Sequence, residues 1–124
     1  MKDNVKQTEF GYEVVWTKSD TYYSKIVGFN KPAKTNMLFH KVKNKSWFIN
    51  EGNFKLNYID TSSGQLFETT LKEGQTFDIP ALMPVSIHCL TPGGSYTEVG
   101  DINDDEDTYY LTPRGEKVDN AAVK

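Results

Sequence analysis

The residue types that could do chemistry are few, and the first of them lie in a strand pair between residues 32 and 52. His40 falls on the first strand of this pair, and Lys45 and Trp47 fall on the second. By the two-residue period of a strand, His40 faces the same side as Leu38, and Lys45 the same side as Trp47. An imidazole can serve as a hydrogen-bond partner, metal ligand or catalyst, and an indole can stack on a sugar ring. Histidine and aromatic residues on strands are nevertheless more often structural.

Other candidate side chains lie further along the chain. Tyr58 could stack on a sugar ring, and Glu98 could face a cavity with Tyr96 or point away from it. Simple alternation turns His88 outward, unless a β-bulge changes the register. Cys89 has apolar neighbours and is expected to be an inert buried thiol. No serine, histidine and aspartate set forms a nucleophile arrangement, and no glycine-rich phosphate loop is present.

Short β-strands are the elements that must position these residues. Segments rich in valine, isoleucine and aromatic residues alternate with turn signals about every 8–12 residues, and a helical hydrophobic period is lacking. The expected strands are 11–16, 21–29, 34–41, 45–50, 53–60, 66–71, 75–79, 85–90 and 95–101, with a final edge strand at 109–111. This pattern predicts an antiparallel sandwich or barrel.

The composition limits the classes of partner. The chain has 124 residues, enough for one domain, and a net charge of −3 with acidic and basic residues interspersed. We expect neither a nucleic-acid partner nor a membrane partner, because no basic surface or membrane-length apolar segment is visible. The first residues lack the apolar core of a signal peptide, so we expect a soluble cytoplasmic protein.

Two segments carry a fixed motif spacing. One leads through His40 to Gly52, and the other leads from Gly74 to Pro80. Their spacing resembles the two motifs of the cupins, which are small double-stranded β-helix (jelly-roll) barrels. The segments FGYEVVW, YYSKIVGF, KSWFINEG and TEVGDINDDEDTYYL are similar to one cupin branch, related to type II mannose-6-phosphate isomerases and sugar-biosynthesis proteins. The resemblance covers about residues 10–115 and implies an all-β cupin barrel.

The resemblance also divides the chain. It implies a single cupin barrel over residues 10–115. Residues 1–9 are expected to be a loose lead-in or an arm that pairs with a neighbouring subunit, and 116–124 a polar tail. We expect a homodimer, because such barrels leave an apolar sheet face and terminal strands that pair across a two-fold axis.

A metal site is the chemistry that the resemblance would normally imply. Its four ligand positions are occupied here by Leu38, His40, Lys45 and Val85. Leucine and valine cannot coordinate, and a lysine amine must first lose a proton. We therefore expect no cofactor; a divalent transition metal, if one binds, would be held by His40 with His88 or Glu98.

A metal-free pocket is the other use of these positions. Lys45 at the family's carboxylate position would suit a phosphate or carboxylate ligand, with His40 as a hydrogen-bond partner. The simpler interpretation is that Lys45 reaches solvent. We expect a non-catalytic or accessory domain that binds a small polar ligand, sugar-like or anionic. The alternative is an enzyme of the sugar isomerase or epimerase type with a rearranged site. The expected ligand-binding residues are His40, Lys45, Trp47, Tyr58, His88 and Glu98.

Overall fold

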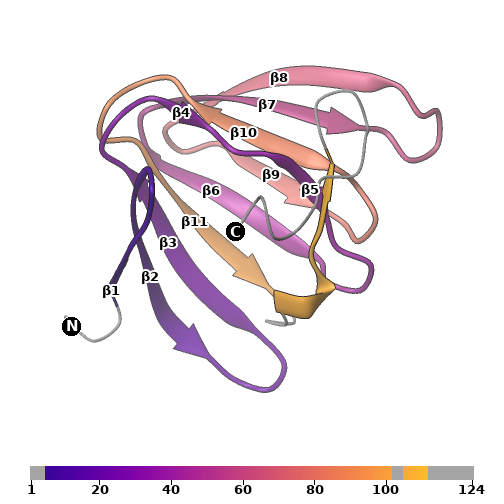
Figure 1. The fold of residues 1–124 in the computed structure, drawn as a ribbon, viewed down its shortest axis with the longest axis horizontal. Coiled ribbons are helices and arrows are strands. Elements are labelled where there is room, and N and C mark those ends of the chain that lie inside the picture. Colours follow the sequence, from indigo (N-terminus) through magenta and orange to yellow (C-terminus); the bar gives the residue numbers. More distant parts are fainter. Residues whose placement is uncertain (1–4, 102–104, 112–124) are drawn as a thin grey trace.

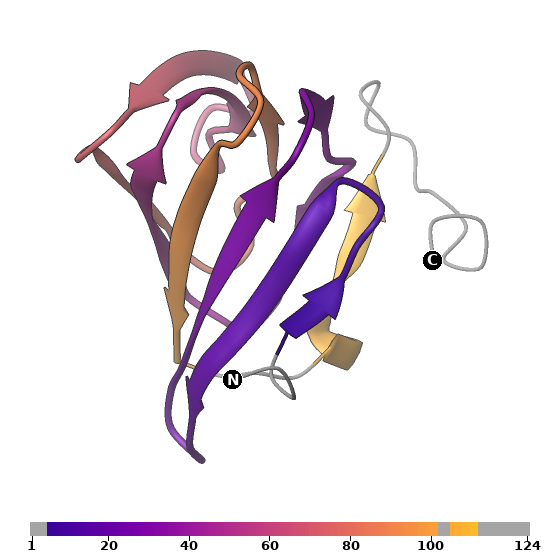
Figure 2. The same cartoon turned by 90° about the vertical axis from the view of Figure 1, so that its left-hand side faces the viewer.

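Two antiparallel β-sheets face each other in the computed structural model, which describes residues 5–101 and 105–111 (Figures 1 and 2). Sheet A has the spatial order β1 (Val5–Gln7), β2 (Gly11–Lys18), β3 (Tyr23–Phe29), β11 (Ser95–Gly100), β6 (Lys45–Glu51) and β9 (Thr76–Ile79). Sheet B has the order β12 (Tyr109–Leu111), β5 (Met37–Phe39), β10 (Val85–Cys89), β7 (Asn53–Ile59) and β8 (Leu66–Lys72), and β4 (Ala33–Lys34) pairs with β10. The 3-10 helix η2 (Asp105–Asp107) precedes β12. The all-β expectation is confirmed.

The core lies between the sheets and follows from strand alternation. On β6, Trp47 and Ile49 are buried while Phe48 between them is exposed, and on β7 Phe54 and Leu56 are buried. Aromatic rings connect the sheets, since Phe54 of sheet B contacts the ring of Tyr96 in sheet A at a centroid distance of 6.0 Å. A fully buried side chain of this size contributes roughly 1.5–3 kcal/mol, so these positions hold the sheets together.

The predicted strand at 34–41 is divided in the structure. β4 ends at Lys34 and β5 begins at Met37. Between them, the Thr35 hydroxyl accepts a hydrogen bond from the Ile87 backbone N–H at 3.1 Å, where a backbone carbonyl would accept it in a regular ladder. The Thr35 backbone N–H still donates to the Ile87 carbonyl at 2.9 Å, so one of the two backbone hydrogen bonds of this pair is replaced and the strand is interrupted there.

Both ends of the chain extend beyond the described residues. Residues 5–7, part of the expected lead-in or arm, form β1, which pairs with β2 of the same chain. Residues 1–4 and the predicted polar tail at 116–124 lie outside the described residues. Within the described ranges, no helix is long and apolar enough to cross a membrane.

Three positions of the motifs, Gly52, Gly74 and Leu82, have a left-handed backbone. Gly52 has φ +93°, and a Cβ there would lie 2.9 Å from the Gly94 Cα, so only glycine fits. Leu82 stands where the cupin motif has glycine, and it has φ 76° with its side chain exposed. A left-handed conformation costs a residue with a Cβ roughly 1–2 kcal/mol.

We predict that Leu82→Gly stabilises the protein. The substitution removes the left-handed strain, and the greater entropy of glycine in the unfolded chain offsets part of the gain, leaving up to about 1 kcal/mol. Urea denaturation measures the difference. Leu90→Gly is the control, because Leu90 is also exposed but has no positive φ. A Leu82→Gly protein no more stable than the wild type would contradict the strain at this position.

Candidate functional site

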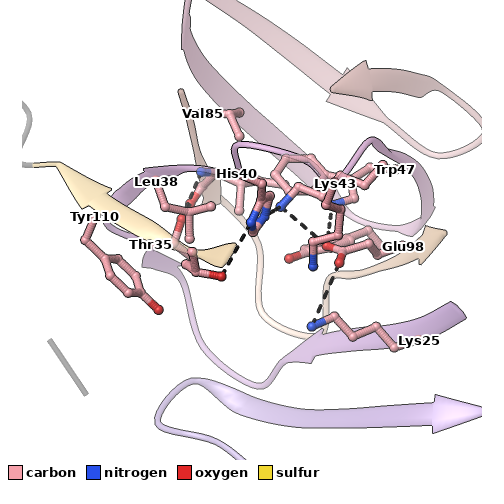
Figure 3. A pocket seen from close by; sticks show the side chains of 13 residues that line it. Lys25, Thr35, Leu38, His40, Lys43, Trp47, Val85, Glu98 and Tyr110 are labelled. Atoms are coloured by element: carbon pink, nitrogen blue, oxygen red, sulfur yellow. Dashed lines mark hydrogen bonds and ion pairs between the residues drawn. The ribbon is translucent and has the colours of Figure 1, made fainter. Parts of the chain in front are cut away.

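A cavity of about 200 Å³ lies between the two sheets near the start of β6 (Figure 3). Sheet A supplies its charged side, and sheet B supplies aliphatic side chains from β5 and β10. Its lining residues are Lys25, Thr35, Leu38, His40, Lys43, Lys45, Trp47, Val85, Ile87, Tyr96, Glu98, Thr108 and Tyr110.

The register of sheet A brings the charged side chains together. Glu98 on β11 lies opposite Lys25 on β3 and opposite Trp47 on β6, so all three face the cavity. Glu98 thus faces inward on the same side as Tyr96, which decides the orientation that the sequence left open. In the next row, Gly100 lies opposite both Lys45 and Tyr23.

Glu98 is the centre of a buried polar network and is only 4% exposed. Its carboxylate accepts hydrogen bonds from the Tyr23 hydroxyl at 2.5 Å and from the Trp47 indole N–H at 2.8 Å. The ammonium groups of Lys45 and Lys25 lie 3.8 and 3.9 Å away. Burial alone would raise the pKa of the Glu98 carboxyl, but the two lysines and the two hydrogen bonds outweigh it and lower the pKa to about 2. The carboxyl is therefore ionised at neutral pH.

Tyr23 reaches Glu98 because β11 has a glycine beside it. A Cβ on Gly100 would lie 2.3 Å from the Tyr23 ring. Burial, and then the charge of Glu98, raises the pKa of the Tyr23 hydroxyl far above its ordinary value, so it stays protonated and donates its hydrogen bond.

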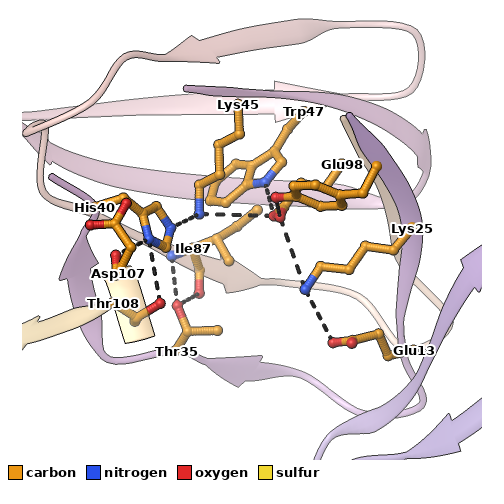
Figure 4. Close-up of polar contacts among 11 residues, drawn as sticks. Glu13, Lys25, Thr35, His40, Lys45, Trp47, Ile87, Glu98, Asp107 and Thr108 are labelled. Atoms are coloured by element: carbon orange, nitrogen blue, oxygen red, sulfur yellow. Dashed lines mark hydrogen bonds and ion pairs between the residues drawn. The ribbon is translucent and has the colours of Figure 1, made fainter. Parts of the chain in front are cut away.

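Lys45 lies between His40 and Glu98 (Figure 4). Its Nζ is 3.1 Å from His40 Nε2, while His40 Nδ1 is 2.9 Å from the Asp107 carbonyl oxygen. A carbonyl can only accept and an ammonium can only donate, so Nδ1 carries the proton and Nε2 accepts from Lys45. Burial, and then the charge of Lys45, lowers the pKa of His40 to about 4. His40 is therefore a neutral imidazole at pH 7.

Asp107 fixes the loop that carries His40. Its carboxylate accepts three backbone N–H bonds, from Lys41 at 2.9 Å and from Val42 and Lys43 at 3.0 Å. Burial opposes ionisation of this carboxyl, but the three backbone N–H groups lower its pKa below the ordinary value. The segment η2–β12 therefore positions both the imidazole and Lys43 at the cavity.

Four of the six predicted ligand-binding residues meet at this cavity: His40, Lys45, Trp47 and Glu98. The other two do not line it. Tyr58 packs against Phe67 and Phe77, with ring centroids 5.7 and 5.1 Å away. His88 lies on the outer side of sheet B, where its neighbours across the strands are Lys34 and Lys55.

Several residues of the site were not predicted. Lys25 and Lys43 line the cavity, and Lys43 Nζ lies 4.8 Å from the centroid of the Tyr23 ring. The signal in the sequence for Lys25 is the alternation that places it on the same face of a strand as Tyr23. Lys43 lies before β6 and has no such strand signal. Asp107 belongs to an acidic stretch that is indistinguishable by composition from a solvated loop.

Solved structures of other proteins share this architecture. Oxalate decarboxylase from Bacillus subtilis superposes with a TM-score of 0.74 at 22% identity, over 86% of this chain and 29% of that chain. CapF with the inhibitor 3-isopropenyl-tropolone gives 0.76 at 16%, over 87% and 34%. KdgF from Halomonas sp. gives 0.66 at 15%, over 77% and 81%. The chain thus spans about a third of the first two proteins. No family model matches the sequence, and neither does any curated protein.

These solved structures are cupin-fold proteins, and the chain has the fold of a cupin barrel. At these sequence identities the likeness concerns the fold.

A divalent metal does not fit the side chains at this cavity. Over the described ranges, no three His, Cys, Asp or Glu residues are grouped so that they could hold a metal ion. The cavity offers the imidazole of His40 and the carboxylate of Glu98, and the ammonium of Lys45 lies within 4 Å of both. An ammonium in that position repels a divalent cation.

Proposed function

We propose that this chain is a small-molecule-binding cupin domain whose cavity holds a small anionic ligand without a metal. The observation that carries the proposal is the charge of the cavity wall. Three lysine side chains, Lys25, Lys43 and Lys45, line the cavity together with one carboxylate, that of Glu98. Outside the lining, Glu13 lies 3.4 Å from Lys25 and Asp101 attracts Lys43, so part of this charge is compensated, while the lining itself carries three ammonium groups against one carboxylate. Such a wall favours a phosphate or carboxylate.

The rest of the lining suits a small organic anion. Trp47 and Tyr96 present aromatic surface, and Leu38, Val85 and Ile87 present aliphatic surface. Thr35, Thr108 and Tyr110 add hydroxyl groups, which can hydrogen-bond to a sugar or a carboxylate. In such a pocket the convergent polar groups fix the orientation of a ligand, while the aromatic and aliphatic side chains pack against its carbon atoms.

Lys45→Met should weaken anion binding. A panel of sugar phosphates and small carboxylates is tested by thermal shift, and the best ligand is then titrated by calorimetry. We expect the wild type to gain stability with at least one anion, and Lys45→Met to bind it at least tenfold more weakly, which corresponds to about 1.4 kcal/mol. Lys72→Met is the matched control, since Lys72 is exposed and does not line the cavity. Equal affinity in Lys45→Met and wild type would rule out this pocket.

The homodimer and the cytoplasmic location stay predictions. The outer side of sheet A supports the first, because Phe48 and Val99 are exposed at 45% and 49% and Tyr12 at 38%. A second copy of the chain could cover these side chains. Light scattering should then give the mass of a dimer, and Phe48→Lys should shift it toward the monomer. A wild-type monomer at micromolar concentration would contradict the homodimer.

A further inference from the structure

Lys45 places a primary amine at the base of the cavity. Its side chain is 6% exposed and its Nζ lies 5.2 Å from the centroid of the Trp47 ring. The amine nevertheless lines the cavity, so a ligand that enters can reach it. Lysine on a strand usually extends into water, whereas here the alternation of β6 turns Lys45 to the same side as Trp47 and Ile49.

The contacts of Lys45 are not those of a tight ion pair. Glu98 is held at hydrogen-bond distance by Tyr23 and Trp47, at 2.5 and 2.8 Å. The Lys45 ammonium is 3.8 Å from the Glu98 carboxylate and closer, at 3.1 Å, to the neutral His40 Nε2. The closest contact of the ammonium is therefore with an uncharged acceptor, and the carboxylate lies beyond hydrogen-bond distance.

The basicity of Lys45 agrees with this geometry. Burial lowers the pKa of the amine, Glu98 opposes the change, and Lys43 and Lys25 add to it, leaving a pKa of about 8. At pH 7 about a tenth of the amine is then neutral and nucleophilic, against less than about a thousandth for an ordinary lysine. Lysines activated by burial are the ones that form imines with carbonyl compounds.

We propose that Lys45 forms a reversible imine with a small oxo acid, a carboxylate that also carries a ketone or aldehyde group. The neutral Nζ attacks the carbonyl carbon, forming the C–N bond while the C–O π bond breaks. A proton moves from nitrogen to oxygen to give a carbinolamine. The C–O bond of the carbinolamine then breaks, its hydroxyl leaves as water with the second proton of the nitrogen, and the C=N bond forms. Hydrolysis reverses these steps, and neither oxidant nor reductant is consumed.

In this reaction His40 would transfer a proton, whereas Lys43 and Lys25 would bind the carboxylate. His40 Nε2 carries no proton and faces Nζ, so it can hold the amine proton during the transfer to oxygen. Lys43 and Lys25 line the same cavity and attract the carboxylate of the oxo acid. The imine therefore rests on the proposed function, because the anion pocket brings the carbonyl to the amine.

Reductive trapping with pyruvate tests the imine. The full chain is incubated with pyruvate and cyanoborohydride, which reduces the imine to a stable secondary amine, and the adduct is located by peptide mass spectrometry. We expect one dominant adduct on Lys45, with the mass of pyruvate less one oxygen atom. Its yield should exceed that on the exposed Lys72 at least tenfold, and its rate should rise as the pH is raised through 8. Equal labelling of Lys45 and Lys72 in the wild type would overturn the proposal.

Variants and a second ligand separate the imine from anion binding. Lys45→Arg keeps the charge but cannot form the imine, so the dominant adduct should disappear, whereas Lys72→Arg should leave it unchanged. Lactate has the charge of pyruvate and no carbonyl. If pyruvate and lactate both raise Tm and pyruvate gives no adduct on Lys45, the imine is wrong and the anion pocket stands. If neither raises Tm, no adduct forms and no other anion of the panel binds, the proposed function fails as well.

Discussion

Replacing Glu98 by alanine is expected to lower the free energy of unfolding by about 3–5 kcal/mol, the range typical of breaking a buried charge network by removing one member. The substitution leaves the Tyr23 hydroxyl and the Trp47 indole N–H without their acceptor. It also leaves the buried ammonium of Lys45 without its nearest opposite charge. Since a domain of this size is stable by about 5–15 kcal/mol, the variant loses a large share of its stability.

Denaturation by urea, followed through tryptophan fluorescence and circular dichroism, measures this loss. Glu68→Ala is the matched control, because Glu68 forms an exposed ion pair with Lys55 at 3.7 Å. Exposed pairs contribute at most about 1 kcal/mol, so the control should stay close to the wild type. A Glu98→Ala protein as stable as Glu68→Ala would show that the network contributes little to folding.

The strands could be predicted from the sequence because their signals are local. Alternation of buried and exposed residues, as at Trp47, Phe48 and Ile49, together with turn residues such as Gly52, marks most strands to within one or two residues. The exception at Thr35 arises from a side-chain hydroxyl that takes the place of a backbone acceptor of the ladder. Such a contact depends on β10, fifty-two positions away, and has no local signal.

The site depends on contacts between distant segments, and for that reason only part of it could be predicted. Glu98 is a charged residue between Thr97 and Val99, and alternation alone does not decide whether it faces the core or the solvent. Its register against Lys25 and Trp47 does. Asp107 binds backbone N–H groups that lie 64–66 positions earlier. Composition cannot separate such a carboxylate from a solvated one. The motif spacing singled out His40, which lines the cavity but lies one residue beyond β5, outside the strand on which the sequence places it.

Tyr58 faces the interior between the sheets, but at a position along the barrel that is away from the cavity. By the two-residue period it lies on the same face of β7 as Phe54 and Leu56, and it packs against the core. Its ring meets Phe67 and Phe77, and it does not line the cavity with Trp47. The two-residue period gives the side of a sheet, whereas the position along the barrel follows from how the sheets pack.

Acidification from pH 6.5 to 4.5 should lower the free energy of unfolding by about 2–3 kcal/mol through His40 alone. Its pKa is about 4 in the folded protein and near 6.5 in the unfolded chain. Between these values the unfolded chain binds more protons than the folded one, so stability rises with pH and falls on acidification. The physical cause is that a second proton on His40 would be buried and would face the Lys45 ammonium at 3.1 Å.

His40→Asn tests this assignment, because asparagine removes the titrating group while keeping a side chain that can donate to the Asp107 carbonyl. Urea denaturation at intervals between pH 6.5 and 4.5 should show a much shallower loss of stability in His40→Asn than in the wild type. His88→Gln removes the other histidine, which lies outside the cavity, and should keep the wild-type slope. The same slope in His40→Asn as in the wild type would mean that another group causes the acid sensitivity. Below pH 4.5 a second loss of stability should follow in the wild type and in His40→Asn alike. Glu98 has a folded pKa of about 2 against an ordinary 4.5, so it stabilises the fold only while it is ionised.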